Sequence, residues 1–274
     1  MLALIYFKSK KSYNCAILKE RGTILRFILA CLMSLSFLCA SDYYIGTTSH
    51  SSDDFEAEFN SKNNENIFDP LSGYNEIMTS FNDKFYEYLL RPTAQGYAYV
   101  MPQMARNGVS NFFDNLFFPI RLVNNLLQLK FQNSLQETER FVLNSTMGIL
   151  GFRDVAGEEL KIKAHDEDFG QTLGYYGVGS GFHVVLPFFG PSNVRDIVGL
   201  TGDMWLNPIT YMKGRGDANL VDNTGQALAA TALYTINRTS LHVKEYDNFK
   251  KDAIELYPFL RNFYESRRDK LISE

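Results

Sequence analysis

The stretch PQMARNGVSNFFDNLFFPIRLVNNLL, residues 102–127, decides the fold class because it holds two short helical patterns, each opened by a proline. Proline is tolerated in the first turn of a helix but not in its interior. After Pro102, and again after Pro119, apolar residues recur with the helical period. The stretch therefore predicts two short amphipathic helices rather than one long one.

The flanking segments extend this helical pattern in both directions. Asp69 and Pro70 suit a helix start, and the apolar residues after them keep helical spacing up to Arg91. We expect that helix to end near Arg91, because Pro92 disfavours the α conformation of the residue before it. A further helix is predicted from 134 to 147, where glycines follow the periodic run and are a usual stop.

Residues 170–181 are rich in glycine and lead into an apolar run with strand character, 182–190. This pattern is typical of a mobile loop or a β-hairpin. The run has no Gly-Lys-Ser/Thr ending and precedes no helix, so a phosphate-binding loop is excluded. Ser180 is not a nucleophile elbow either, because Val178 occupies the position that requires glycine.

The rest of the chain is predicted to be largely helical. Ser192 should cap a helix that runs toward Trp205. From 224 to 270 the helix propensity is high, with breaks expected near Thr239-Ser240 and at Pro258. The expected fold class is therefore mainly α.

The N-terminal segment, 1–41, has the order of a secretory signal. Basic residues precede an apolar run, 27–38, which is too short to span a hydrocarbon core that needs about 20 residues. A retained membrane anchor is the weaker interpretation. Residues 42–66 are rich in Ser, Asp, Glu and Asn without periodicity, and we interpret them as a disordered tether.

All three cysteines, Cys15, Cys31 and Cys39, lie in this leader. Disulfides and a cysteine nucleophile deep in the fold are therefore excluded. Cys39 is a possible lipidation site, but Leu38 before it makes a poor lipobox, and cleavage after Ser41 suits an ordinary signal peptidase better.

Composition narrows the function further. The formal net charge is −4, so the electrostatic footprint of a nucleic-acid-binding protein is missing. The chain holds 22 Phe and 16 Tyr but a single Trp. So many aromatic residues indicate either an aromatic core or contact with lipid, because aromatic side chains suit membrane interfaces.

No residues assemble into a catalytic or metal-binding constellation, so we expect neither an enzyme nor a cofactor. His165 precedes the acidic run 166–168, which could serve as a cation site or an acid/base pair, but a solvated turn before a helix is the better interpretation. Arg140 with Asp154, and Arg195-Asp196, are interpreted as ion pairs between packed helices.

Bulky apolar faces on short helices have two explanations. In a soluble bundle they form the core, whereas in an interfacial protein they lie against acyl chains. Periodicity does not separate the two. The candidate membrane-facing residues, with the interhelix core as the alternative, are Phe112, Phe113, Phe117 and Phe118.

A set of ordered strings from residue 69 to about 210 resembles the MlaA family, also called VacJ. The strings are DPLSGYN (69–75), RP (91–92), ARNGVSNF (105–112), RFVLNST (140–146), DFGQTLG (168–174), LPFFGPS (186–192) and RD (195–196). After Tyr211 the likeness fades. The resemblance divides the chain into a helical domain, 67–240, and a C-terminal helical extension, 241–274.

The resemblance implies a mainly α, ring-like bundle of short amphipathic helices in the inner leaflet of the outer membrane, beside a trimeric porin. Such a protein would remove mislocalised glycerophospholipids from the outer leaflet through an amphipathic channel. It would hand them to a periplasmic carrier of the MlaC type, without covalent chemistry. A lipid-acting periplasmic enzyme and a structural porin adaptor are the alternatives.

The resemblance also suggests residues for the channel. The glycine-rich hairpin would shape or gate it, and the first helix would hold its wall. A lipid head group needs a polar path, which amide side chains provide. The candidate channel or gating residues are Phe81, Asn82, Asn124, Gln128, Asn144, Gly177, Gly179, Gly181 and Phe182, with Asn125 and Thr146 beside them.

Overall fold

The computed structural model describes residues 69–211 and 224–274. In these ranges the protein is mainly helical and carries one small antiparallel sheet of two strands. The predicted fold class is confirmed. The predicted signal segment, the tether and Cys39 lie outside the described residues, as does the segment 212–223.

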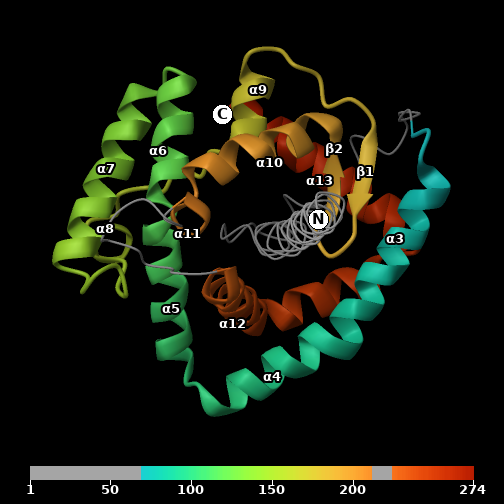
Figure 1. Cartoon of the computed structure of the whole chain (residues 1–274), viewed down its shortest axis with the longest axis horizontal. Helices are drawn as coiled ribbons and strands as arrows, with labels where there is room; N and C mark the ends of the chain where they lie inside the picture. The colour runs from blue at the N-terminus through green and yellow to red at the C-terminus, as the bar shows by residue number, and fades with distance from the viewer. Residues whose placement is uncertain (1–68, 212–223) are drawn as a thin grey trace, which may run out of the picture.

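A long curved run opens the described chain (Figure 1). It consists of α3 (Ser72–Phe85), a π-helical turn η1 (Tyr86–Leu90) and α4 (Arg91–Val100). The predicted stop near Arg91 is wrong, because the wide turn of η1 resets the helix and Pro92 falls in the first turn of α4. Proline is acceptable there, since it breaks no hydrogen bond inside the new helix.

The start of α3 also differs from the prediction. The helix begins at Ser72, and the Asp69 carboxylate caps nothing. It pairs instead with Arg261 Nη1 at 3.2 Å and accepts a hydrogen bond from the Tyr257 hydroxyl. Asp69 therefore ties the beginning of the described chain to its last helix.

The next helices follow the prolines as predicted. Pro102 precedes α5 (Gln103–Leu116), and Pro119 is the second residue of α6 (Phe118–Leu127). The predicted helix 134–147 is α7 (Phe131–Thr146), which is followed by the single turn α8 (Val155–Glu158).

The glycine-rich region forms a hairpin between two helices. In chain order the elements are α9 (Phe169–Tyr175), β1 (His183–Leu186), β2 (Gly190–Asn193), α10 (Val194–Leu206) and α11 (Pro208–Tyr211). The strands pair from His183 opposite Asn193 to Leu186 opposite Gly190. The predicted cap at Ser192 is displaced by one residue, because Asn193 accepts the hydrogen bond from the Asp196 amide at 2.9 Å.

Two long helices complete the fold, α12 (Thr224–Asp252) and α13 (Leu256–Ser273). The predicted break at Thr239-Ser240 is wrong. That segment is held by tertiary contacts, since the Ser240 carbonyl accepts from Arg106 Nη1 at 2.8 Å. The expected boundary at residue 240 therefore falls inside α12. The real break precedes α13, which carries Pro258 in its first turn.

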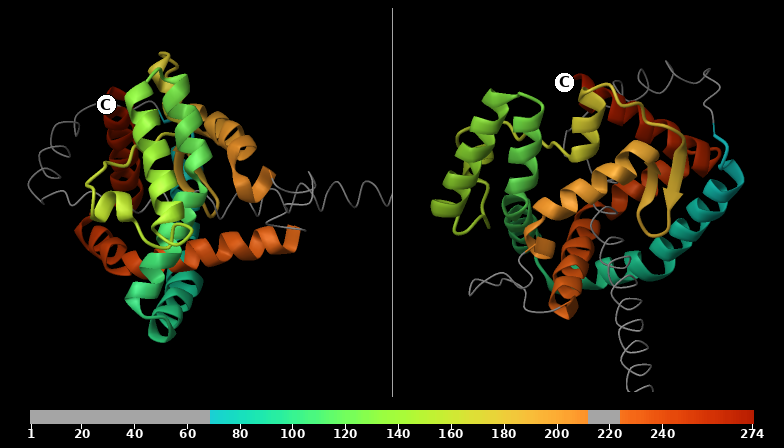
Figure 2. Two further views of the ribbon diagram at one scale, coloured as in Figure 1. Left: turned by 90° about the vertical axis from the view of Figure 1, so that its left-hand side faces the viewer. Right: turned by 45° about the horizontal axis from the view of Figure 1, so that its top comes forward.

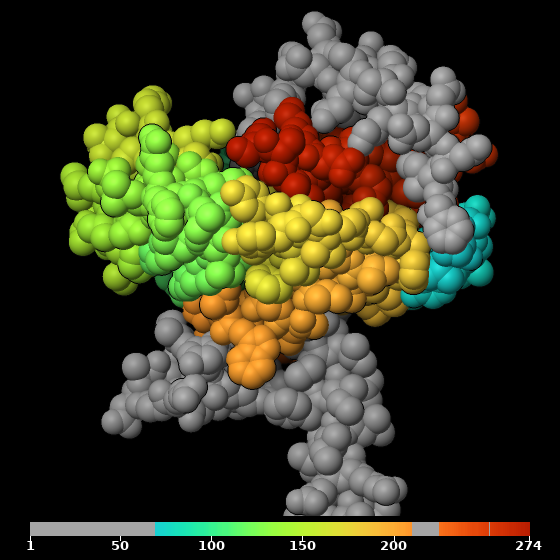
Figure 3. All heavy atoms as spheres, turned by 90° about the horizontal axis from the view of Figure 1, so that it is seen from above, coloured from blue at the N-terminus to red at the C-terminus, as the bar shows by residue number. Residues whose placement is uncertain are grey.

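These elements follow one another around a ring (Figures 1 and 2). Helix α12 packs against α4 and α5, while α13 contacts α3, α9 and β2, so the end of the chain joins its beginning. Seen from above, α9 and the hairpin lie between α13 and α10 (Figure 3). The buried apolar clusters are small; one joins Phe113, Ile209 and Tyr234, another joins Phe259 and Leu260.

Candidate functional site: an apolar outer arc over a polar interior

The helices bury polar side chains and expose large apolar ones. On α3 the buried residues are Asn75, Thr79 and Asn82, while the exposed ones include Tyr74, Ile77 and Phe81. A helix on the surface of a water-soluble domain normally shows the reverse pattern. One polar stripe of α3 is thus turned inward, while Glu76 and Lys84 remain exposed beside the apolar side chains.

Large apolar side chains stay exposed along the chain from 88 to 152, and we call this set of residues the outer arc. The outer arc consists of the exposed apolar residues Tyr88, Leu89, Tyr99, Val100, Met104, Leu126, Leu127, Leu129, Phe131, Leu135, Val142, Met147, Ile149, Leu150 and Phe152. Tyr99 is 93% exposed and Met104 is 88% exposed. Monomeric soluble proteins rarely show so extended an apolar surface, so the outer arc indicates contact with lipid or a partner.

Charged groups of the same stretch turn away from this surface. Glu139 is the only charged residue between 88 and 152 that is exposed as a whole residue, and half-exposed Asp114 pairs with Arg238 at 3.4 Å. Four other ion pairs join buried or partly buried side chains: Arg91–Asp247 at 2.7 Å, Arg121–Glu137 at 2.7 Å, Lys130–Glu167 at 2.7 Å and Arg140–Asp154 at 2.9 Å. Paired interior charges leave the outside uncharged.

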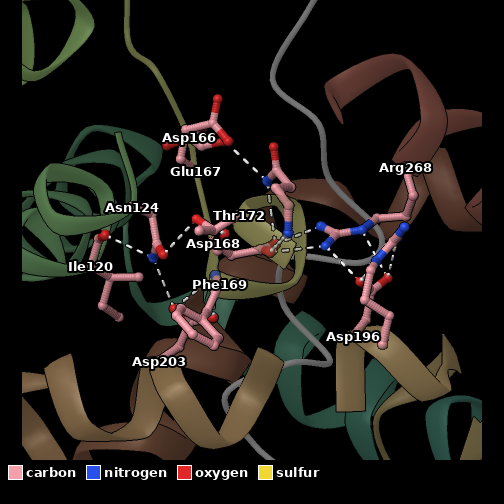
Figure 4. Close-up of polar contacts among 12 residues, drawn as sticks. Ile120, Asn124, Asp166, Glu167, Asp168, Phe169, Thr172, Asp196, Asp203 and Arg268 are labelled. Carbon is pink, nitrogen blue, oxygen red and sulfur yellow. Dashed lines mark hydrogen bonds and ion pairs between the residues drawn. The ribbon is translucent and has the colours of Figure 1, made fainter. Parts of the chain in front are cut away.

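A buried network joins α6, α9 and α10 (Figure 4). Asn124 donates to Asp203 Oδ1 at 3.0 Å and accepts from the Thr172 hydroxyl at 2.9 Å. The backbone amide of Phe169, at the start of α9, donates to both Asp203 oxygens at 3.1 Å. Burial and the charge of Asp168 raise the pKa of Asp203 to about 7, despite these donors.

Arg268 of α13 lies between two carboxylates. Its Nη2 atom donates to Asp168 Oδ1 at 2.8 Å and to Asp196 Oδ1 at 3.0 Å, and the Tyr264 hydroxyl donates to Asp196 Oδ2 at 2.6 Å. Burial alone would raise the pKa of Asp168, but the guanidinium and the hydrogen bonds from Arg268 and Gln171 lower it to about 2. This network holds α13 against α9 and α10 and closes the ring.

Two asparagines clamp the free edge of the hairpin. Asn75 accepts from the Val185 amide at 2.8 Å and donates to the His183 carbonyl at 3.1 Å. Two helical turns later, Asn82 accepts from the Phe188 amide at 2.7 Å and donates to the Leu186 carbonyl at 2.9 Å. Each side chain satisfies a donor and an acceptor that an edge strand would leave open.

Aromatic contacts support the same clamp. Phe188 has a positive φ of 68° at the tip of the hairpin, and its ring meets Phe81 at 5.1 Å and Phe85 at 4.9 Å between centroids. Of the two predicted wall residues, Asn82 is thus buried in the clamp and Phe81 covers it from the exposed face. Their role in a channel stays a prediction.

The amide residues predicted to line a polar path are all buried and hydrogen-bonded. Gln128 donates to Glu167 Oε2 at 2.8 Å, and Asn144 donates to Asp154 Oδ1 at 2.8 Å while it accepts from the Ala156 amide. With Asn124, they fix the chain segments that follow α7. The geometry gives these three side chains a positioning role, and a direct contact with lipid stays a prediction.

The predicted gating residues lie together in the segment between α9 and β1. Gly177 and Gly181 have positive φ values of 82° and 72°, and a Cβ atom on Gly177 or Gly179 would meet nothing within 4 Å. Phe182 is 37% exposed at the end of this segment. Gating by these residues remains untested.

The four phenylalanines predicted as membrane-facing are buried or half-buried, which is unfavourable for contact with a membrane. Phe113 is 5% exposed and packs on Tyr234 with ring centroids 5.0 Å apart, which is the interhelix core alternative. Phe112, Phe117 and Phe118 are half-buried; Phe118, for example, stacks on Phe141 at 4.3 Å. Sequence reasoning therefore missed the more exposed outer-arc residues beside them.

The histidines of the described ranges are engaged in structural contacts. The His165 ring lies 2.6 Å from Gln136 Oε1, and buried His183 lies 2.8 Å from Glu265 Oε1. Asp168 of the neighbouring acidic run caps α9 by accepting from the Gln171 amide at 2.7 Å. Within 69–211 and 224–274, no three His, Cys, Asp or Glu side chains come together as metal ligands would.

Asn75, Asp203 and Arg268 were not among the predicted site residues. One signal was available, because Asn75, Thr79 and Asn82 form a stripe of uncharged polar residues at helical spacing. No such signal exists for Asp203 or Arg268, whose partners lie far away in the sequence.

None of the helices in the described part of the chain combines the length and the apolar character that a membrane crossing requires. A family model described as "MlaA lipoprotein" matches residues 67–271. The chain is 42% identical over 148 residues to the "Intermembrane phospholipid transport system lipoprotein MlaA" of Escherichia coli K12, which covers 53% of this chain and 59% of that protein.

Other relatives agree with this match. An uncharacterized protein of Rickettsia bellii is 34% identical over 164 residues, 58% of this chain and 64% of its own. The chain thus spans less than two thirds of the length of these curated relatives. A solved structure described as "Structural basis for maintenance of bacterial outer membrane lipid asymmetry" is similar with a TM-score of 0.63 and 31% identity, covering 75% of this chain and 99% of that one.

Proposed function

Because the chain belongs to the MlaA family, we propose that it removes mislocalised glycerophospholipids from the outer leaflet of the outer membrane. The lipids would pass through an amphipathic channel to a periplasmic carrier of the MlaC type, and a trimeric porin would stand beside the protein. We place the protein on the periplasmic side of the outer membrane, as an exported protein and not an enzyme.

The outer arc carries the proposal. An apolar exterior that exposes one charged residue, Glu139, between 88 and 152 suits immersion among acyl chains. The interior offers amides and paired charges instead, which a head group tolerates and a dry core would not. Helices too short or too polar to cross a bilayer suit immersion in a single leaflet.

The hairpin supports a gating role within this proposal. Its edge is clamped to α3 from the base to the tip, through Asn75 and Asn82. The segment that precedes it carries glycines with open space around them, Gly177 and Gly179. A clamped hairpin beside a segment with open space at its glycines would confine movement to that segment, as a gate requires.

Deletion of the gene tests the proposed function. The expected result is more phospholipid in the outer leaflet and a greater sensitivity to detergents, both reversed by the intact gene. A deletion strain with an unchanged outer leaflet would contradict the proposal. Mass spectrometry of lipid that co-purifies with the mature protein should find glycerophospholipid.

The two alternatives predict different outcomes. A lipid-acting enzyme would turn over labelled phospholipid in a way that depends on His165, whose ring contacts Gln136. A purely structural porin adaptor would co-purify with the porin but without lipid. His165 and Glu167 make structural contacts with Gln136 and Lys130, and these contacts favour neither alternative.

A further inference from the structure

The turn that follows α7 has two features that its own stability does not explain. Ile149 and Leu150 adopt positive φ values of 55° and 58°, although neither is glycine and Ile149 is β-branched. That conformation costs roughly 1–2 kcal/mol per residue. Their side chains are also 75% and 68% exposed. A backbone that is strained and at the same time exposes large apolar side chains indicates a functional role.

The backbone of this turn is held in place. The Leu150 amide donates to the Ser145 carbonyl at 3.1 Å, and the Gly151 amide donates to the Asn144 carbonyl at 2.8 Å. Gly151 has a φ of 90° and lies directly on Asn115, where a Cβ atom would come within 2.6 Å. Phe152 stacks on Phe112 of α5 with centroids 5.0 Å apart. The turn therefore presents Ile149 and Leu150 from a preformed support.

The residues around the turn change from apolar to charged along the chain. Met147 is 62% exposed beside the turn, and Phe152 is 46% exposed. The next residue, Arg153, is exposed and pairs with Glu159 at 2.7 Å and with Glu158 at 3.8 Å. An apolar tip bordered by charges of both signs matches the boundary between acyl chains and zwitterionic head groups.

We infer that residues 147–152 form a rigid apolar finger that inserts among the acyl chains of a lipid leaflet. The inference rests on the membrane location proposed above and names the element that enters most directly. We favour a lipid over a protein as the partner of these residues. A specific protein interface needs about one hydrogen bond per 100–200 Å², and an apolar turn cannot supply them. The finger exposes no charged side chain and uses backbone donors internally. Figure 2 shows it at the end of α7, on the α4 side of the molecule.

Tryptophan fluorescence tests the finger, because the chain contains one tryptophan, Trp205. In a Trp205→Phe background, Ile149→Trp would be compared with Ile254→Trp, a β-branched position that is 102% exposed at the junction of α12 and α13. The mature protein would be mixed with phosphatidylethanolamine and phosphatidylglycerol vesicles whose acyl chains carry bromine. We expect the emission of the Ile149→Trp variant to shift to shorter wavelength and to be quenched, and that of the Ile254→Trp variant to remain unchanged.

The double variant Ile149→Ser/Leu150→Ser gives a second measurement without disturbing the core. Partitioning onto the same vesicles should fall by about tenfold or more, because two aliphatic side chains that enter the acyl region are lost. Vesicle binding with unquenched Ile149→Trp fluorescence would overturn the finger and leave the membrane location standing. Failure of the unmodified protein to bind vesicles would overturn the membrane location as well.

Discussion

Asp203 shows at the scale of one residue how the polar interior depends on pH. Its pKa is raised to about 7 by burial and by Asp168, from an unfolded value of about 3.9. A raised pKa contributes stability that is fully present below the unfolded value and is lost as the pH rises through the folded one. The unfolding free energy should therefore fall between about pH 4 and pH 7 through Asp203.

The variant Asp203→Asn resembles the protonated acid and should remove this dependence. Relative to the variant, the wild type should lose up to a few kcal/mol over that pH range, since one pKa unit corresponds to about 1.4 kcal/mol. Thermal unfolding at both pH values measures the effect. Asp168 does not contribute to this change, because its pKa of about 2 means that the stability it provides is lost only below about pH 4. Equal pH profiles for wild type and variant would contradict the assignment; exposed Asp166→Asn is the control.

Arg268 predicts a larger effect. The substitution Arg268→Met leaves Asp168 buried without its cation and leaves Asp196 with Arg195 alone, which should cost about 3–5 kcal/mol of unfolding free energy. Arg153→Met is the matched control: its guanidinium is exposed and pairs with Glu159, so a loss below about 1 kcal/mol is expected. Urea denaturation compares the two, and equal losses would show that the ring does not depend on Arg268.

The same residues mark the reach of sequence reasoning. Arg140 with Asp154, and Arg195 with Asp196, were predicted as ion pairs between packed helices. Both pairs form, at 2.9 Å and 3.0 Å, but only Arg140–Asp154 joins two helices, because Arg195 and Asp196 are neighbours in α10. Their partners lie near in sequence or share a family motif. Asp203 and Arg268 were missed, because a pairing over many tens of residues leaves no local pattern.

At the scale of elements, the asparagine clamp predicts a local effect on the hairpin. Asn82→Ala removes the acceptor of the Phe188 amide and the donor to the Leu186 carbonyl. Each loss leaves a backbone group without its hydrogen-bond partner, which should cost about 1–3 kcal/mol of local stability. Hydrogen exchange of the Phe188 amide should become faster, with exposed Asn107→Ala as the control. Unchanged exchange in the Asn82→Ala variant would mean that the hairpin holds itself.

The crossing of α9 and α10 predicts a packing effect. A Cβ atom on Gly199 would lie 2.5 Å from the Gly170 backbone nitrogen, so Gly199→Ala must push the two helices apart and lower the melting temperature. Gly73 in α3 has nothing within 4 Å of its Cβ position. There Gly73→Ala should be neutral or stabilise by up to about 1 kcal/mol, because alanine favours helix. A tolerated Gly199→Ala would contradict the close crossing.

Element boundaries were predicted well where one local signal acted. Helices α5 and α6 begin at the prolines that indicated them, Pro102 and Pro119. The expected ends at Arg91 and Thr239 failed for a common reason, namely that other parts of the fold compensate the local preference. A π-helical turn accommodates Pro92, and contacts with α5 keep α12 helical past Thr239.

At the scale of the molecule, periodicity predicts that a helix is amphipathic but not which face points inward. The polar stripe of α3 is buried and the apolar outer arc is exposed, which only the closed ring makes visible. Ring closure itself depends on α13, whose contacts with α3 and α9 join distant ends of the chain. The resemblance to a family supplied the ring; the residues alone predicted a mainly α fold of short helices.

If lipid covers the outer arc, the apolar character of the outer arc should determine whether the protein stays in the membrane. The triple variant Tyr99→Lys/Met104→Lys/Leu135→Lys changes exposed side chains and should keep its helical circular dichroism. It should nevertheless leave the membrane fraction and fail to restore detergent resistance, because each lysine would have to leave water. The control adds the same charges outside the outer arc, at Ser80, Asn248 and Ile254. Membrane retention of the outer-arc variant would mean that another anchor, not this surface, holds the protein in place.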